Sequence, residues 1–110
     1  MTPDIQPIRK KVEAGKYVVS FTHTEKVRIR RIEAEDMEEA IHSGDIIEDY
    51  PEDPRGPSCL ILGFDHRNRP LHVLCGKLEE EEILIITVYE PDPGAWEDDC
   101  RTRKGEIQDA

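Results

Sequence analysis

Apolar residues recur at helical spacing in the first half of the chain. Residues 4–14 carry isoleucine and valine at i, i+3 and i+7, which predicts a short amphipathic helix that Gly15 would end. Thr22–Glu25 has the spacing of a capping box, so a second helix is predicted to begin there. Residues 37–41 again place apolar side chains at i, i+3 and i+4, and this helical stretch should end near Ser43.

One strand is predicted between the first two helices, because residues 17–22 are rich in β-branched and aromatic residues. After Gly44 the pattern changes from helical to extended. Later in the chain, further strands are predicted at about 45–50, 58–64, 70–77 and 83–90. Their short, turn-rich links predict consecutive hairpins, hence an antiparallel meander in sequential order. Asp92 and Pro93 predict the cap of a short C-terminal helix. The expected fold class is α+β, with N-terminal helices, a β-meander and a short C-terminal helix, all in a single domain over residues 1–110.

Alternation along the last two strands predicts two different sheet faces. The more apolar side of each strand should meet the helices, and Leu84, Ile86 and Val88 are expected on that side. The opposite face would then be partly open. The polar residues expected together on this face are His72, Thr87 and Tyr89.

Charge is segregated along the chain, whose net value is −10. Residues 1–31 have a net charge of +5, whereas residues 32–54 carry ten acids and no Lys or Arg. Residues 78–99 carry nine acids and no bases. Phosphate binding needs local positive charge, so the overall sign argues against nucleic acid, but the segregation leaves room for one basic face. A plain solubilising surface explains the same pattern.

Cysteine usage and hydropathy bear on compartment and cofactors. The chain has three cysteines without CxxC spacing, which argues against a disulfide framework or a zinc knuckle. The sequence also has no closely spaced pair of potential metal ligands, so it does not indicate a metal site. No apolar run approaches the roughly 20 residues that cross a membrane, and the first residues lack the apolar centre of a signal peptide. We therefore expect a cytoplasmic protein with no metal or other cofactor and no membrane association.

Five segments together resemble a family of small bacterial proteins that is grouped only as a domain of unknown function. They are FTHTEKVRIRR (21–31), IIEDYPEDP (46–54), PSCLILG (57–63), RPLHV (69–73) and ITVYEPDPGAW (86–96). The resemblance covers about residues 17–103, and the segments are specific in combination. The family has an arginine four residues after its early histidine. In this chain Val27 stands there, and the basic residues are Arg28, Arg30 and Arg31.

The resemblance implies a toxin-like protein. Members of the family are often encoded beside a short zinc-finger protein similar to an antitoxin. Their helix–helix–meander order is similar to that of the RelE and MqsR toxin superfamily, in which a sheet face and adjacent helices cut RNA without a metal. The implied partners are therefore an antitoxin of the zinc-finger type and an RNA substrate.

The chemistry of metal-free RNA cleavage can be assigned to candidate residues. The reaction needs a base for the 2′-hydroxyl, an acid for the leaving 5′-oxygen and cations on the phosphate. His23 and His72 are candidates for acid and base, and Tyr89 is a candidate for donating to phosphate or stacking on a base. Thr87 would help shape the pocket. The candidate phosphate ligands, whose guanidinium groups suit bidentate contacts, are Arg28, Arg30 and Arg31.

Each candidate also has a purely structural interpretation. His23 would pack at a helix start, His72 would be a satisfied cross-strand residue, and Thr87 and Tyr89 would simply be good strand formers. The arginines would pair with nearby acids on a solvated face. The alternative function is then a non-catalytic protein-binding module whose acidic loops dock a basic partner.

Overall fold

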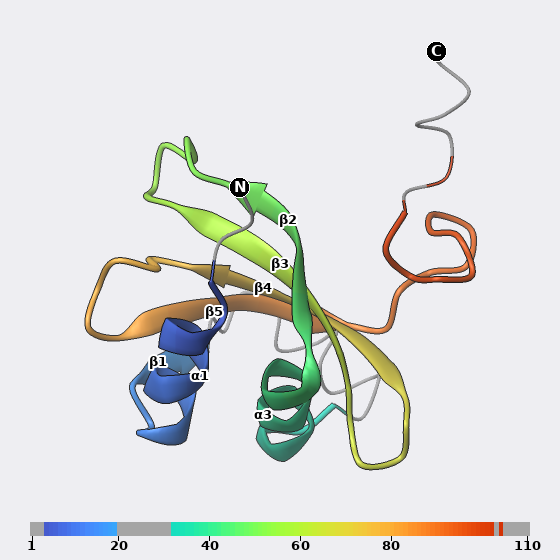
Figure 1. Cartoon of the computed structure of the whole chain (residues 1–110), viewed down its shortest axis with the longest axis horizontal. Coiled ribbons are helices and arrows are strands. Elements are labelled where there is room, and N and C mark those ends of the chain that lie inside the picture. Colours follow the sequence, from blue (N-terminus) through green and yellow to red (C-terminus); the bar gives the residue numbers. More distant parts are fainter. Residues whose placement is uncertain (1–3, 20–31, 103, 105–110) are drawn as a thin grey trace.

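A five-stranded mixed sheet with strand order β1-β5-β4-β3-β2 forms the centre of the computed structural model, which describes residues 4–19, 32–102 and 104 (Figure 1). Its elements are α1 (Gln6–Glu13), β1 (Tyr17–Val19), α3 (Ala34–Ser43), β2 (Asp45–Tyr50), β3 (Ser58–Phe64), β4 (Pro70–Gly76) and β5 (Ile83–Tyr89). The predicted α+β class is confirmed.

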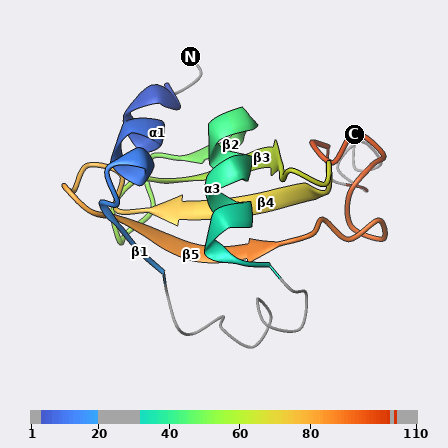
Figure 2. The same cartoon turned by 90° about the horizontal axis from the view of Figure 1, so that it is seen from below.

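Both described helices cover the same face of the sheet (Figure 2). Helix α1 lies within the predicted range 4–14, and α3 ends at Ser43 as expected. Glu33 and Asp36 form a capping box at the start of α3, which satisfies backbone N–H groups of its first turn. The helix predicted to begin at Thr22–Glu25 lies outside the described residues. Neither described helix is long and apolar enough to cross a lipid bilayer.

The meander prediction is confirmed, because β2, β3, β4 and β5 are sequential antiparallel neighbours. The sheet also contains a parallel pairing that was not predicted. Strand β1 runs parallel to β5, with Tyr17 opposite Ile83 and Val19 opposite Ile85. Helix α3 and strands β2 to β4 lie between β1 and β5 in the sequence, so the connection is long, as parallel strands require. Strand β1 is thus an edge of the sheet, and β2 is the other edge.

A register shift between β4 and β5 makes part of the face prediction wrong. Leu74 lies opposite Thr87, but the next residue of β4, Cys75, lies opposite Ile85. The extra residue on β5 breaks the strict alternation, as a β-bulge does. Ile83, Ile85 and Val88 therefore belong to the buried core, and Leu84 and Ile86 are only half-buried.

The predicted C-terminal helix is also wrong for the part of this segment that the structure describes. Residues 91–102 form turns and bends instead of a helix. The Asp92 carboxylate accepts the Gly94 N–H at 2.8 Å, and the Asp99 carboxylate accepts the N–H groups of Arg101 and Thr102. Such bonds from aspartate side chains to nearby backbone compete with helix formation.

Helix α3 lies almost directly on the backbone of β3. A Cβ atom added to Gly63 would stand only 1.7 Å from the carbonyl oxygen of Ala40, so the helix and strand could not stay this close if any other residue replaced Gly63. The core between α3 and the sheet is apolar. Its fully buried members include Ala40, Ile41, Cys59, Ile61, Leu71, Val73, Cys75, Ile83 and Ile85.

A buried ion-pair network holds the β3–β4 turn against α3. The Arg69 guanidinium donates to Asp65 at 3.0 Å and to Asp36 at 3.3 Å, and both carboxylates are almost fully buried. Burial of Asp65 opposes its ionisation, but hydrogen bonds from Arg69 and Arg67 outweigh that effect and lower the pKa of this carboxyl group. The turn therefore depends on Arg69.

Strand β1 is linked to α3 through one polar contact. The Tyr17 hydroxyl donates to the Glu38 carboxylate, and this bond, together with burial and the negative charge of Glu38, raises the pKa of Tyr17 to about 12. The bond stabilises the fold below the ordinary tyrosine pKa of 10.0, and its contribution is lost as pH rises towards 12.

We therefore expect a late tyrosine ionisation near pH 12 in the ultraviolet absorbance titration of the protein. Tyr17→Phe should remove this step, and Glu38→Gln should move it back towards pH 10 because the acceptor loses its charge. The stability difference between wild type and Tyr17→Phe should be present at pH 8 and should vanish as Tyr17 ionises. An unchanged titration curve in Glu38→Gln would show that this contact does not raise the pKa of Tyr17.

Candidate functional site

His72 and Tyr89 lie opposite each other on β4 and β5. Their strand neighbours Leu71, Val73 and Val88 belong to the core that the helices cover, so alternation puts both residues on the other sheet face. The His72 Nδ1 atom is 3.2 Å from the Tyr89 hydroxyl, and the two rings meet edge-to-face with centroids 5.2 Å apart. Pairing across neighbouring strands therefore brings together two of the residues that the sequence singled out. Thr87 lies on the same side of β5, opposite Leu74.

His72 is not on an open surface, because its side chain is fully buried. The C-terminal segment covers this side chain through two contacts. The Trp96 ring packs edge-to-face against the imidazole, with ring centroids 4.4 Å apart, and the carbonyl oxygen of Cys100 lies 2.7 Å from Nε2. The expectation of a partly open face is thus wrong at His72. Trp96, itself almost fully buried, anchors this segment.

The hydrogen bonds of His72 determine how its protons are placed. A carbonyl oxygen only accepts, so Nε2 carries the hydrogen that is donated to Cys100. In a neutral imidazole Nδ1 is then an acceptor, and the Tyr89 hydroxyl donates to it. Tyr89 therefore has its proton directed at a base, and His72 reaches any bound molecule only through Tyr89.

Tyr89 also lines a cleft of about 460 Å³ that spans β2 to β5. Its other lining residues are Tyr50, Asp53, Arg55, Ser58, Leu60 and Leu74. The floor is apolar, whereas the loop between β2 and β3 contributes the charged groups. An aromatic hydroxyl, a guanidinium and a serine hydroxyl thus surround one hollow on this face.

Asp53 organises the charged rim of this cleft. Its two carboxylate oxygens accept from the Arg55 guanidinium at 3.2 and 3.3 Å, and one of them also accepts from Ser58 at 2.9 Å. Hydrogen bonds from the Arg55 backbone and side chain, followed by that of Ser58, lower the pKa of Asp53 to about 2. Arg55 has five N–H donors, and Asp53 engages two of them, so this fork is held in place with donors left for an anion.

Four predicted site residues, namely His23, Arg28, Arg30 and Arg31, lie outside the described part of the chain. The role of these arginines as phosphate ligands therefore stays a prediction. The sequence did not predict Asp53, Arg55 and Ser58 as site residues, because a Pro- and Gly-rich segment indicates only a turn between two strands. The only signal in the sequence was a lone arginine directly after the acidic block that ends at residue 54.

Comparison with known proteins gives one match. The model of a family described as a domain of unknown function, DUF4258, matches residues 24–90. This range includes β2 to β5, hence both His72 and Tyr89 and the whole lining of the cleft. No curated protein and no solved structure matches the chain. Because the match spans more than half of its residues, the chain belongs to the DUF4258 family.

Proposed function

We propose that this chain is a toxin-like, metal-independent RNA endonuclease of a bacterial toxin–antitoxin pair. The observation that carries the proposal is the Tyr89–His72 hydrogen bond at the edge of a cleft that also contains Arg55. A hydroxyl that already donates to a buried imidazole is suited to exchanging a proton with a ligand in the cleft. The resemblance to the RelE and MqsR superfamily supplies the reaction class.

The proposed reaction begins with the 2′-hydroxyl of the RNA. Tyr89 accepts its proton while passing its own proton to His72 Nδ1, and the 2′-oxygen attacks the adjacent phosphorus. The bond from phosphorus to the 5′-oxygen breaks, and a protonated group supplies the proton that this oxygen needs; His23 remains the candidate. The Cys100 carbonyl, which accepts from Nε2, stabilises the positive charge that forms on His72. Arg55 stabilises the charge on the phosphate.

A second candidate function is favoured by the charge of the sheet edge. Strand β2 is an outer strand with acidic residues, among them the exposed Asp49, and the following loop adds Glu52. Carboxylates at an edge repel RNA and attract basic protein segments. A non-catalytic module that binds a basic partner is therefore the rival proposal, and a zinc-finger antitoxin would be one such partner.

The two proposals are separated by expressing the full chain from an inducible promoter in bacteria. The nuclease proposal predicts growth arrest and fragmentation of cellular RNA, which Tyr89→Phe relieves. Tyr17→Phe, the same substitution on the helical side of the sheet, should leave toxicity intact. Neither arrest nor RNA fragments from folded wild-type protein would remove the nuclease proposal and favour the binding module.

A further inference from the structure

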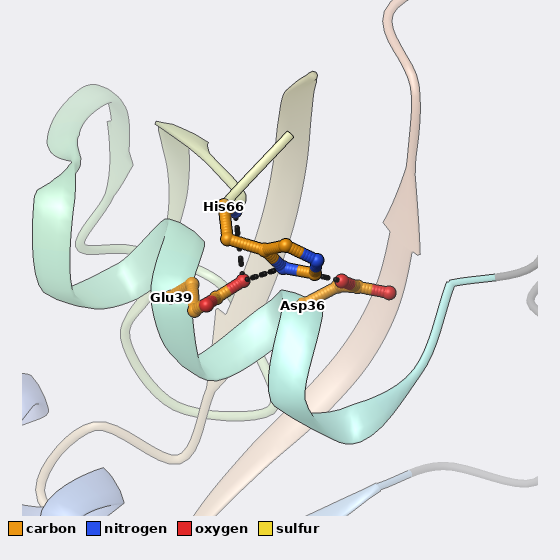
Figure 3. A group of neighbouring side chains, drawn as sticks. All are labelled: Asp36, Glu39 and His66. Carbon is orange, nitrogen blue, oxygen red and sulfur yellow. Dashed lines mark hydrogen bonds and ion pairs between the residues drawn. The ribbon is translucent and has the colours of Figure 1, made fainter. Parts of the chain in front are cut away.

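Three potential metal ligands converge where the β3–β4 turn meets α3 (Figure 3). Asp36 and Glu39 are three residues apart on α3, so their side chains leave the same face of the helix. His66 comes from the turn, and one ligand atom from each residue lies within 4.8 Å of the others. The sequence did not indicate this set, because folding must first bring His66 to a helix that ends more than 20 residues earlier.

The distances are close to those of a coordination shell. His66 Nδ1 is 2.8 Å from Glu39 Oε1 and 3.8 Å from Asp36 Oδ1. Zinc bonds to imidazole and carboxylate of about 2.0–2.2 Å place neighbouring ligand atoms roughly 3–3.5 Å apart. All three atoms lie within 4.8 Å of one another, so rotations of the exposed His66 and half-exposed Glu39 side chains would bring them to this spacing around a cation.

Asp36 is already held in the required orientation. Its Oδ2 atom accepts from the Glu33 N–H at 2.9 Å and from Arg69 at 3.3 Å, and Arg67 also approaches this oxygen. Its other oxygen, Oδ1, is the one that faces His66. Carboxylates that bind metals are commonly fixed in this way by hydrogen bonds to the oxygen that does not face the metal.

Charge and access also suit a cation. Three carboxylates lie near His66, those of Asp36, Glu39 and Asp65, and two guanidinium groups, those of Arg67 and Arg69, partly balance their charge. Both guanidinium groups contact Asp36 at Oδ2 and not at the oxygen that faces His66. Glu39 and His66 line a separate cleft of about 550 Å³ between the helices and the turn, which leaves space for water ligands. The imidazole matters most, because it favours a transition metal over the calcium or magnesium that carboxylates alone prefer.

We propose that Asp36, Glu39 and His66 form a binding site for one divalent transition-metal ion of the zinc type, completed by water. The ion would join the β3–β4 turn to α3 and so stabilise the fold. The site lies on the helical side of the sheet, whereas the cleft at Tyr89 lies on the other, so it takes no part in the proposed RNA cleavage.

The test uses the full chain, stripped with EDTA and dialysed, with zinc alone as the probe. Calorimetry should show one ion bound per chain, and zinc should raise the melting temperature by an amount that grows with the logarithm of the free zinc concentration divided by Kd. His66→Ala and Glu39→Gln should each weaken binding at least about 10-fold, by analogy with losses from metal-site shells. With cobalt in place of zinc, the visible spectrum should change in wild type and not in His66→Ala.

Two matched variants exclude other ligands. His42→Ala removes another exposed histidine of this region, and Cys100→Ser removes the partly exposed thiol. Both should bind zinc as wild type does. Equal zinc affinity in His66→Ala and wild type, or loss of binding in Cys100→Ser alone, would overturn the proposal. RNA cleavage plays no part in these readouts, so failure of the metal site and failure of the nuclease proposal are distinguishable.

Discussion

Tyr89→Phe is expected to slow RNA cleavage by about 10²–10⁴-fold, the usual contribution of a general acid or base. Phenylalanine keeps the ring that packs against His72 and removes only the hydroxyl that joins the imidazole to the cleft. The rate of the chemical step should fall while binding of RNA changes little, because the lost interaction acts in the transition state. Single-turnover cleavage of a defined RNA measures this directly.

Stability provides the control for this variant. Removing the donor loses one hydrogen bond to His72, a contact that typically contributes about 0.5–1.5 kcal/mol, so the protein should still fold. Tyr17→Phe loses a comparable hydrogen bond on the helical side and should cleave RNA at the wild-type rate per folded molecule. Equal cleavage rates in Tyr89→Phe and Tyr17→Phe would remove Tyr89 from the reaction.

His72→Ala is a poorer probe than its position in the sequence suggests. Its side chain is fully buried, hydrogen-bonded through both nitrogens and packed against Trp96. Truncation would leave a cavity and an unpaired carbonyl, so lost activity could not be separated from lost structure. The hydroxyl deletion at Tyr89 avoids that ambiguity.

Arg69→Leu is expected to lower the free energy of unfolding by about 3–5 kcal/mol, because it leaves buried carboxylates without their principal cation. Asp65 is completely buried and Asp36 nearly so, and Arg69 donates to both. Urea unfolding followed by the fluorescence of Trp96 would measure the loss. Introducing Asp65→Asn into the variant should recover part of it, since the amide removes the uncompensated charge and its oxygen can still accept the N–H groups of the turn.

Arg67→Leu is the matched control, because Arg67 approaches the same two carboxylates at 3.8 and 3.9 Å from a half-exposed position. Solvent screens a long contact from a half-exposed guanidinium, so this contact should contribute about 0–1 kcal/mol. If Arg69→Leu cost no more than Arg67→Leu, the buried network would not be what holds the turn against α3.

The elements of this fold that depend on local pattern were predictable. Period and turn residues located α1, the end of α3 and the four meander strands. The pairing of β1 with β5 was not predictable, because the two strands are far apart in the sequence and no local pattern indicates that they are neighbours. The bulge opposite Leu74 likewise has no periodic signal, so the strict alternation assigned Leu84 and Ile86 to the wrong face.

The candidate site was predictable only in part. Alternation and sequential pairing were enough to put His72 and Tyr89 on one face, where cross-strand register makes them partners. The burial of His72 depends on the irregular segment that carries Trp96, and short side-chain-to-backbone bonds rather than a periodic pattern determine its path. Arg55 enters the cleft because Asp53 holds it there, an arrangement that only the folded loop reveals.

The most direct test of the nuclease proposal is the end chemistry of ribosome-free RNA cut by the purified chain, with and without EDTA. Attack by the 2′-hydroxyl without a metal predicts fragments ending in a 2′,3′-cyclic phosphate, formed at the same rate when EDTA is present. No cleavage by folded protein under either condition, or cleavage that EDTA abolishes, would contradict the proposal.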